Sequence, residues 1–358
     1  MSWDGNVHGV LIGSKSYPLV NSGLLVNKYD KKFDSYYFLK NKSGFSSIVM
    51  TRRSFLNASA KVSVKSGEVF IEKIKEAGLS YNPVRSEINF GGSISLFSKP
   101  SELLPHGPML KLKNFSIVEN FKVPGFVDKV VNDDLKAEEG LNLLYKKSYT
   151  TEYLSQLLST SNLGSETERK LVPSRWSVTA VDDIIGKGLK KNVGVDSFSN
   201  ILFFKNTYLG NDFYIFLFPG SWEFELVEYY RGELLSDYES VFGRKSYAFN
   251  TSGGYYAARM GVLEYLKREN ISAKVLVVRD ITDYYKFSLG VWVVREAVRK
   301  TMLVKPLEFE NVLKFKKEAK LYISFNLSKV VSELFKTSKV LKSVFYQSSL
   351  SAFMKHQK

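Results

Sequence analysis

A chain of 358 residues allows one large domain or two of ordinary size, and its 44% hydrophobic and 14% aromatic content supplies a core and excludes global disorder. Lysine and arginine number 51 against 36 aspartate and glutamate, so the formal net charge is +15. This balance favours polyanionic partners, above all nucleic acid. The absence of cysteine excludes disulfides, thiolate nucleophiles and cysteine-ligated zinc.

Three scattered histidines, His8, His106 and His356, are too few for a histidine-rich metal site. A metal site would therefore be built mainly from carboxylates, which suits magnesium or manganese. The N-terminus carries Asp4 and no long apolar run, and no stretch of about 18 apolar residues occurs. We expect a soluble, cytoplasmic protein without a membrane partner.

In chain order, the Gly-, Ser-, Tyr- and Asn-rich residues 1–60 predict loops and short strands. A strand is predicted over 61–65 and a helix over 68–77, and four prolines between 99 and 124 predict an irregular connection. Apolar spacing predicts helices over 127–147 and 152–158 and a third that begins near Thr179. Three aromatic, β-branched segments then predict an antiparallel meander: 200–206, 212–219 and 222–230.

After Gly253-Gly254 we expect a helix over 255–268 and a strand over 274–279, while periodicity leaves 290–300 undecided between strand and helix. The residues from 301 onward hold 11 lysines against 4 glutamates and predict amphipathic helices. The fold class is therefore α+β, with a mixed or antiparallel central sheet packed with helices and a helical basic C-terminal tail. The safest division is a body over 1–300, with a subdivision somewhere in 125–200, and a tail over 301–358.

The most unusual segment is ERKLVPSRWSVTAVDDIIGK, residues 168–187. Pro173 predicts that Arg175 and Trp176 lie in an extended connection, and Thr179 with Asp182 resembles a capping box. Around a helix start, basic side chains and backbone amides would bind phosphate, and a tryptophan would stack on a base. The candidates for phosphate and base binding in this segment are Arg169, Lys170, Arg175, Trp176 and Lys187.

Two acidic groups are candidates for metal binding or acid/base catalysis: Asp182 with Asp183, and Glu138 with Glu139. Carboxylates on one helix face near residue 138 could meet those near residue 182 across a cleft and hold a divalent cation. The plainer alternative is that the aspartates cap a helix, Trp176 belongs to the core, and the acidic residues near 138 form a solvated face.

The segment NTSGGYYAAR, residues 250–259, resembles the anion-binding start of a helix, with Arg259 one turn inside that helix. The alternative is that Gly-Gly marks only a turn before the helix, which is common. Two charged pairs, Arg279-Asp280 and Arg295-Glu296, follow apolar segments, at positions where functional sites often lie at the ends of strands. Alternatively, either pair forms an internal salt bridge.

The C-terminal residues 347–354 have the spacing Q-x-x-L-x-x-F-φ. A single tight turn would bring Leu350, Phe353 and Met354 together as an apolar plug, with the Gln347 amide in a separate polar pocket. This pattern matches the box by which proteins dock on the replication sliding clamp, with Met at a position that is more often aromatic. The alternative is a fraying terminal helix.

With these residues laid out, the chain resembles the archaeal Nre DNA repair family over nearly its whole length. The resemblance rests on five segments, closed by the clamp box: 13–24, 130–139, 169–183, 253–266 and 289–299. It implies a role in the DNA damage response and recruitment by the clamp PCNA through Gln347, Leu350, Phe353 and Met354. It settles no reaction. Many relatives carry a cysteine-rich element for zinc, which this chain lacks.

Three hypotheses follow. The first is a DNA-binding repair factor that the clamp delivers and that needs no cofactor. The second is a metal-dependent nuclease or nucleotide- or DNA-modifying enzyme with a magnesium or manganese site around 169–187, in which the arginines and carboxylates named above converge in one cleft. The third is an adaptor whose body contacts only proteins.

Overall fold

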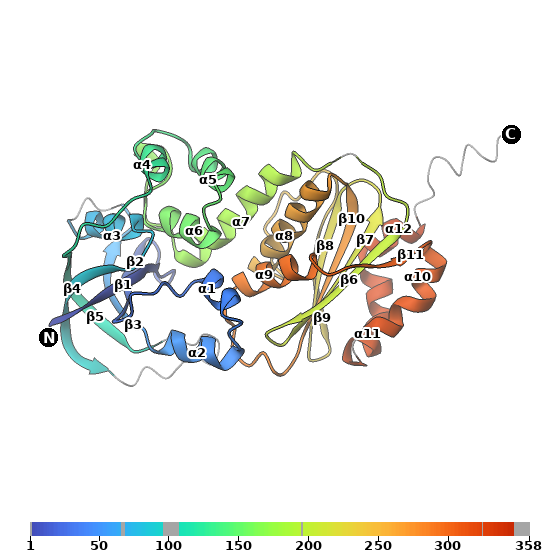
Figure 1. Cartoon of the computed structure of the whole chain (residues 1–358), viewed down its shortest axis with the longest axis horizontal. Coiled ribbons are helices and arrows are strands. Elements are labelled where there is room, and N and C mark those ends of the chain that lie inside the picture. Colours follow the sequence, from blue (N-terminus) through green and yellow to red (C-terminus); the bar gives the residue numbers. More distant parts are fainter. Residues whose placement is uncertain (1, 66–68, 96–106, 195, 324, 347–358) are drawn as a thin grey trace. The chain divides into compact units, whose positions relative to one another are not determined.

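The computed structural model describes residues 2–65, 69–95, 107–194, 196–323 and 325–346. Two compact units make up the chain (Figure 1). The first unit contains Met1–Gly188 and Phe287–Leu289, and the second contains Leu189–Lys286 and Gly290–Lys358.

A closed five-stranded barrel forms the first part of the first unit (Figure 1). Its strands are β1 (Ser2–Ile12), β2 (Leu19–Asn27), β3 (Leu56–Ser63), β4 (Val84–Ser95) and β5 (Met109–Ile117), in the order β1-β2-β3-β5-β4. All neighbouring pairs are antiparallel except β3 and β5, which are parallel. Helices α1 (Ser35–Lys40) and α2 (Phe45–Arg53) connect β2 to β3, and α3 (Val69–Leu79) connects β3 to β4.

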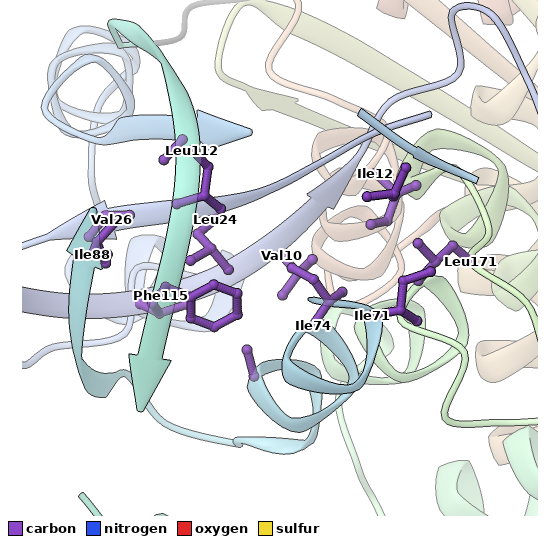
Figure 2. Packing of buried hydrophobic residues seen from close by; sticks show 14 of the residues in the cluster. Val10, Ile12, Leu24, Val26, Ile71, Ile74, Ile88, Leu112, Phe115 and Leu171 are labelled. Carbon is purple, nitrogen blue, oxygen red and sulfur yellow. The ribbon is translucent and has the colours of Figure 1, made fainter. Parts of the chain in front are cut away.

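Alternating apolar side chains fill the barrel, as the two-residue period of a strand requires. Figure 2 shows Leu24 and Val26 of β2 in this core with Phe115 of β5. Ile74 of α3 packs beside Val10 of β1, so the helix closes one end of the barrel. Each such side chain contributes about 1.5–3 kcal/mol when it is fully buried.

The rest of the first unit is helical: α4 (Gly125–Val131), α5 (Ala137–Lys146), α6 (Thr151–Ser159), the 3₁₀ turn η1 (Glu166–Glu168) and α7 (Ser174–Lys190). The single helix predicted over 127–147 is wrong, because two helices with a turn between them cover this range. The side chains of Asp133 and Asp134 accept hydrogen bonds from the backbone N–H groups of Asp134 and Glu166, and these bonds compete with helical ones.

A mixed six-stranded sheet forms the centre of the second unit, in the order β11-β6-β7-β10-β8-β9. Its strands are β6 (Ile201–Tyr208), β7 (Asn211–Pro219), β8 (Glu223–Tyr230), β9 (Glu233–Glu239), β10 (Ala273–Ile281) and β11 (Leu307–Phe309). Helices α8 (Gly253–Glu269) and α9 (Trp292–Thr301) cover one face (Figure 1). The other face packs against α10 (Val312–Glu318), the 3₁₀ turn η2 (Ala319–Tyr322), α11 (Phe325–Thr337) and α12 (Lys339–Tyr346).

The fold class α+β is confirmed, but two further local predictions are wrong. The first 60 residues contain most of three long barrel strands rather than loops and short strands. The three strands over 200–230 do not form a meander, because β10 lies between β7 and β8, parallel to β8. The apolar run Val275–Val278 is buried on both faces, which a central strand provides. Residues 292–301 are helical, so α9 settles the undecided segment.

Among the described residues, no helix is both long and apolar enough to cross a membrane.

His8 of β1 makes the stability of the first unit dependent on pH. Burial lowers the pKa of His8 from 6.5 to about 4, and the ring packs edge-on against Phe55, with 4.9 Å between ring centroids. A lowered histidine pKa contributes stability above the unfolded pKa, and this contribution is lost as the pH falls toward the folded pKa.

We therefore expect the free energy of unfolding to fall by about 2–3 kcal/mol between pH 7.5 and 4.5 through His8 alone. Urea denaturation of the intact protein and of His8→Phe at both pH values measures this term. The loss should be smaller in His8→Phe by that amount; equal losses in the two proteins would contradict the assignment.

Candidate nucleic-acid interface

An exposed aromatic pair lies at the rim of the barrel. Trp176 belongs to the first turn of α7 and is 47% exposed, while Tyr17 belongs to the turn between β1 and β2 and is 39% exposed. Their ring centroids are 5.1 Å apart with an interplanar angle of 49°. We call Tyr17 and Trp176 the aromatic pair. Aromatic rings that stay this exposed are available to stack on another flat surface.

Backbone contacts fix the aromatic pair on the barrel. The Leu171 N–H donates to the Val64 carbonyl at 3.0 Å, and the Val64 N–H donates to the Pro18 carbonyl at 3.1 Å. The Ile12 N–H donates to Ser174 Oγ at 2.9 Å. Residues 171–174 are therefore hydrogen-bonded to the C-terminal end of β1 and to the residue that follows β3, at one end of the barrel.

Basic side chains accompany the aromatic pair in the sequence. Lys15 precedes Tyr17 in the same turn, and Lys170 and Arg175 lie on either side of the anchored segment; all three are exposed. Three exposed cationic residues thus lie within six positions of one of the two rings in the sequence.

The prediction that Arg175 and Trp176 lie in an extended connection is wrong. Helix α7 begins at Ser174, five residues before the predicted start, and the N–H groups of Trp176 and Ser177 both donate to the Pro173 carbonyl. Proline is well suited to a helix start, because its missing N–H needs no partner there.

Arg169 holds together backbone segments of the helical part of the first unit. Its guanidinium donates to the carbonyls of Gly164 at 2.8 Å, Val131 at 2.8 Å and Asp133 at 3.1 Å. Val131 is the last residue of α4, where unpaired carbonyls attract a cation. Arg169 therefore fixes the turn between α4 and α5 to the segment before η1.

Asp182 and Asp183 lie inside α7, so the predicted capping box with Thr179 is wrong. The Thr179 hydroxyl instead donates to the carbonyl of Arg175 within the helix. The Asp182 side chain is buried, with 1% of the residue exposed. Asp183 forms an ion pair with Lys187 at 2.7 Å, one helical turn later.

Glu138 and Glu139 are exposed in the first turn of α5, where negative charge stabilises a helix. The Glu139 carboxylate accepts from the N–H of Lys136 at 3.3 Å, and Asp134 accepts from the N–H of Glu166 at 2.7 Å. Within the part of the chain that the structure describes, no group of three or more His, Asp or Glu side chains is arranged to hold a metal ion.

Arg259, in α8 of the second unit, is buried with 3% exposed and binds Glu239 of β9 at 2.9 Å. The indole N–H of Trp222 donates to the same carboxylate at 2.6 Å. Beside them Asp237 accepts from both the N–H and the hydroxyl of Thr251, just before α8. These contacts fix the start of α8 to β9.

Asp237 and Glu239 were not among the residues predicted from the sequence. The signal was present, because two acidic residues at alternate positions of a strand lie on the same face.

A second buried network lies where β8 and β10 end. Arg279 of β10 binds Glu228 of β8 at 2.7 Å and donates twice to the Asn211 side-chain carbonyl, at 2.9 and 2.7 Å. The register places Arg279 directly opposite Glu228. Gly254 lies close by, because a Cβ there would be 2.9 Å from Glu228 Oε1. The sequence left Arg279 open between a site at the end of a strand and an internal ion pair, and the structure contains an internal ion pair, with Glu228.

The clamp box, Gln347, Leu350, Phe353 and Met354, lies outside the described residues. The described chain ends at Tyr346, the last residue of α12.

Comparison with known proteins identifies the family. Models of "Archaeal Nre, N-terminal" and "Archaeal Nre, C-terminal" match residues 3–235 and 239–353. The chain belongs to the archaeal Nre family. No solved structure matches it.

Two similar relatives are both called DNA repair protein NreA. The one from Archaeoglobus fulgidus is 34% identical over 327 residues, which cover 86% of this chain and 82% of the relative. The one from Haloferax volcanii is 32% identical over 317 residues, which cover 81% and 75%. DNA repair protein NreB of A. fulgidus is 32% identical over 255 residues, which cover 68% of this chain and 64% of its own length.

Arg169→Ala should lower the free energy of unfolding by about 2 kcal/mol, because three backbone carbonyls lose a charged donor. Lys170→Ala is the matched control, since Lys170 is an exposed neighbour, and its effect should stay within about 0.5 kcal/mol. Chemical denaturation of both variants measures the difference. An Arg169→Ala protein that keeps full stability and loses only DNA affinity would instead make Arg169 a phosphate ligand.

Proposed function

We propose that this protein acts in DNA repair and that the sliding clamp PCNA brings it to DNA through Gln347, Leu350, Phe353 and Met354. The names of the three relatives, all DNA repair proteins, carry the first part of the proposal. The spacing Q-x-x-L-x-x-F-φ near the C-terminus carries the second. Buried apolar anchors of this kind supply most of the binding energy of a short docking peptide.

Helix α12 immediately precedes the clamp box in the sequence. Glu225 of β8 is buried, and its carboxylate accepts from the Ser338 hydroxyl at 2.6 Å and from the Val340 N–H at 3.0 Å. Val340 and Leu341 of α12 are buried against the sheet. The peptide therefore starts from a helix that is firmly fixed to the second unit.

DNA is the second partner in this proposal. The aromatic pair and the exposed Lys15, Lys170 and Arg175 at the barrel rim combine ring surfaces with cations, the two features that hold nucleic acid without a cofactor. The net charge of +15 favours the same class of partner.

The metal-dependent enzyme receives less support from the described residues. Arg169 is bound to backbone carbonyls, and the Glu139 carboxylate is bound to a backbone N–H group. Asp183 pairs with Lys187. These contacts are those of residues that stabilise helices and turns, so a DNA-binding factor remains our proposal.

Binding of the intact protein to its PCNA tests the docking proposal. We expect Leu350→Ala/Phe353→Ala to weaken binding roughly 100-fold or more in calorimetry, because each anchor of this kind contributes about 2 kcal/mol or more. Lys355→Ala/Gln357→Ala is the matched control in the same segment and should bind like the intact protein.

An intact protein that ignores the clamp would refute the docking proposal. Equal binding by the Leu350→Ala/Phe353→Ala variant would also refute it, because the apolar plug would then contribute nothing.

A further inference from the structure

The barrel of the first unit has a strand order with a known use. A closed barrel in the order β1-β2-β3-β5-β4, with a parallel β3–β5 pair and a helix between β3 and β4, has the arrangement of an OB-fold. Barrels of this kind hold oligonucleotides or oligosaccharides on the β2–β3 face and the β1–β2 loop. The fold alone does not decide what a barrel binds; the side chains on the binding face do.

Charge is segregated between the two sides of the barrel. The outward positions of β3 and β5 carry Lys61, Lys111 and Lys113, all exposed. Strands β2, β3 and β5 contain no acidic residue. The acidic residues of the barrel strands, Asp4 and Glu87, lie on β1 and β4. We call the side formed by Lys61, Lys111 and Lys113 the lysine face.

Small and polar residues lie between the lysines of the lysine face. Lys61 lies opposite Asn21, and Lys111 lies beside Ser59. Gly23 is opposite Ser59, and a Cβ at Gly23 would be 2.5 Å from the Ala58 carbonyl. Exposed lysines of this kind reach the phosphates of a bound strand, and small or polar neighbours do not obstruct them with bulky side chains.

The lysine face leads to the aromatic pair. Ser63, two residues after Lys61, is paired with Leu19, the first residue of β2, which follows Tyr17 and Pro18 directly. Lys65 is exposed just beyond β3. From Ser59 to Lys65 the chain covers about 20 Å at the rise of a strand, and Lys61, Ser63 and Lys65 are exposed along it, toward the turn that holds Tyr17.

We propose that the lysine face and the aromatic pair bind a single strand of DNA. The lysines contact the phosphates, and the rings of Tyr17 and Trp176 stack on an unpaired base at the rim. Unpaired bases are required, because a ring stacks on the face of a base only where no neighbouring base covers it. This inference rests on the proposed function and names the form of DNA that the body of the protein holds.

The lysine face is tested by fluorescence anisotropy with the full-length protein and a labelled oligothymidine of about 15 nucleotides, near the upper end of the 4–16 that one such barrel covers. We expect Lys61→Gln/Lys111→Gln/Lys113→Gln to weaken binding more than tenfold. Its slope of log affinity against log salt should be shallower by about 2, at roughly 0.7 per phosphate contact. Lys122→Gln/Lys129→Gln/Lys146→Gln removes the same charge from exposed lysines outside the barrel strands and should bind nearly as the intact protein does.

The aromatic pair is tested in the same assay. Trp176→Ala should weaken binding roughly 5- to 100-fold, and Trp176→Phe should retain most of the affinity, because it keeps a ring. Tyr36→Ala is the control, since Tyr36 is 64% exposed and belongs to α1, outside the barrel strands and α7. Circular dichroism melts of all variants verify that they fold.

Equal weakening by the two lysine triples would overturn the inference, because binding would then follow overall charge. Equal affinity of the intact protein for a duplex of the same length would also overturn it. The clamp variant Leu350→Ala/Phe353→Ala separates the proposals. If it still binds the oligonucleotide but not the clamp, both stand. If the intact protein binds the clamp but no single strand, this inference fails and clamp recruitment is untouched.

Discussion

The attachment of residues 171–174 to the barrel is the constraint on which the first unit depends. Leu171 donates its N–H to Val64 and buries its side chain completely in the barrel core. Figure 2 shows Leu171 beside Ile12 and Ile71, at the end of the core near β1 and α3. Ser174 then accepts the N–H of Ile12. Because α7 starts at this point, its first turn places Trp176 against Tyr17.

Polar bonds connect the same segment to the preceding helix. The Ser159 hydroxyl donates to the Val172 carbonyl at 2.7 Å, and the Val172 N–H donates to the Ser159 carbonyl at 3.0 Å. The barrel, α6 and α7 therefore share one short piece of chain. An exposed ring is held in one position most effectively by such a backbone anchor, since its own side chain makes few contacts.

The second unit relies on paired charges. Arg259 with Glu239 and Arg279 with Glu228 are both largely buried, where a lone charge would cost several kcal/mol. On the opposite face Glu225 fixes α12, and burial raises the pKa of its carboxyl group. These contacts join neighbouring strands or a strand and a helix, so they specify how the elements of the second unit pack together.

The sequence predicted the elements better than their arrangement. The spacing of apolar residues predicted α3, α8 and β10. This spacing is a local property of the sequence, and it indicates whether one face or both faces of an element are buried. It missed the barrel, since strands such as β2 contain Asn, Ser and Gly, residues that also mark loops. It also missed the position of β10 between β7 and β8, because pairing between distant strands is a tertiary property.

The candidate site shows the same division. The composition around Pro173 indicated Trp176 and its basic neighbours as candidates. The predicted extended conformation was wrong, because a helix begins directly after Pro173. Tyr17 had no signal of its own, since its partnership with Trp176 joins residues about 160 positions apart and depends on the anchored segment. Asp237 and Glu239 had a signal in their alternation along β9, which only the register of the sheet made meaningful.

Photo-crosslinking tests the central claim, that this anchored rim and the barrel face beside it hold unpaired DNA. A single-stranded oligonucleotide with photoreactive bases is irradiated with the full-length protein, and the modified residues are located by mass spectrometry. The account predicts cross-links at Tyr17 or Trp176 and along β2, β3 and β5. Cross-links confined to the second unit, for example at Phe335 and Phe345 between α11 and α12, would contradict it.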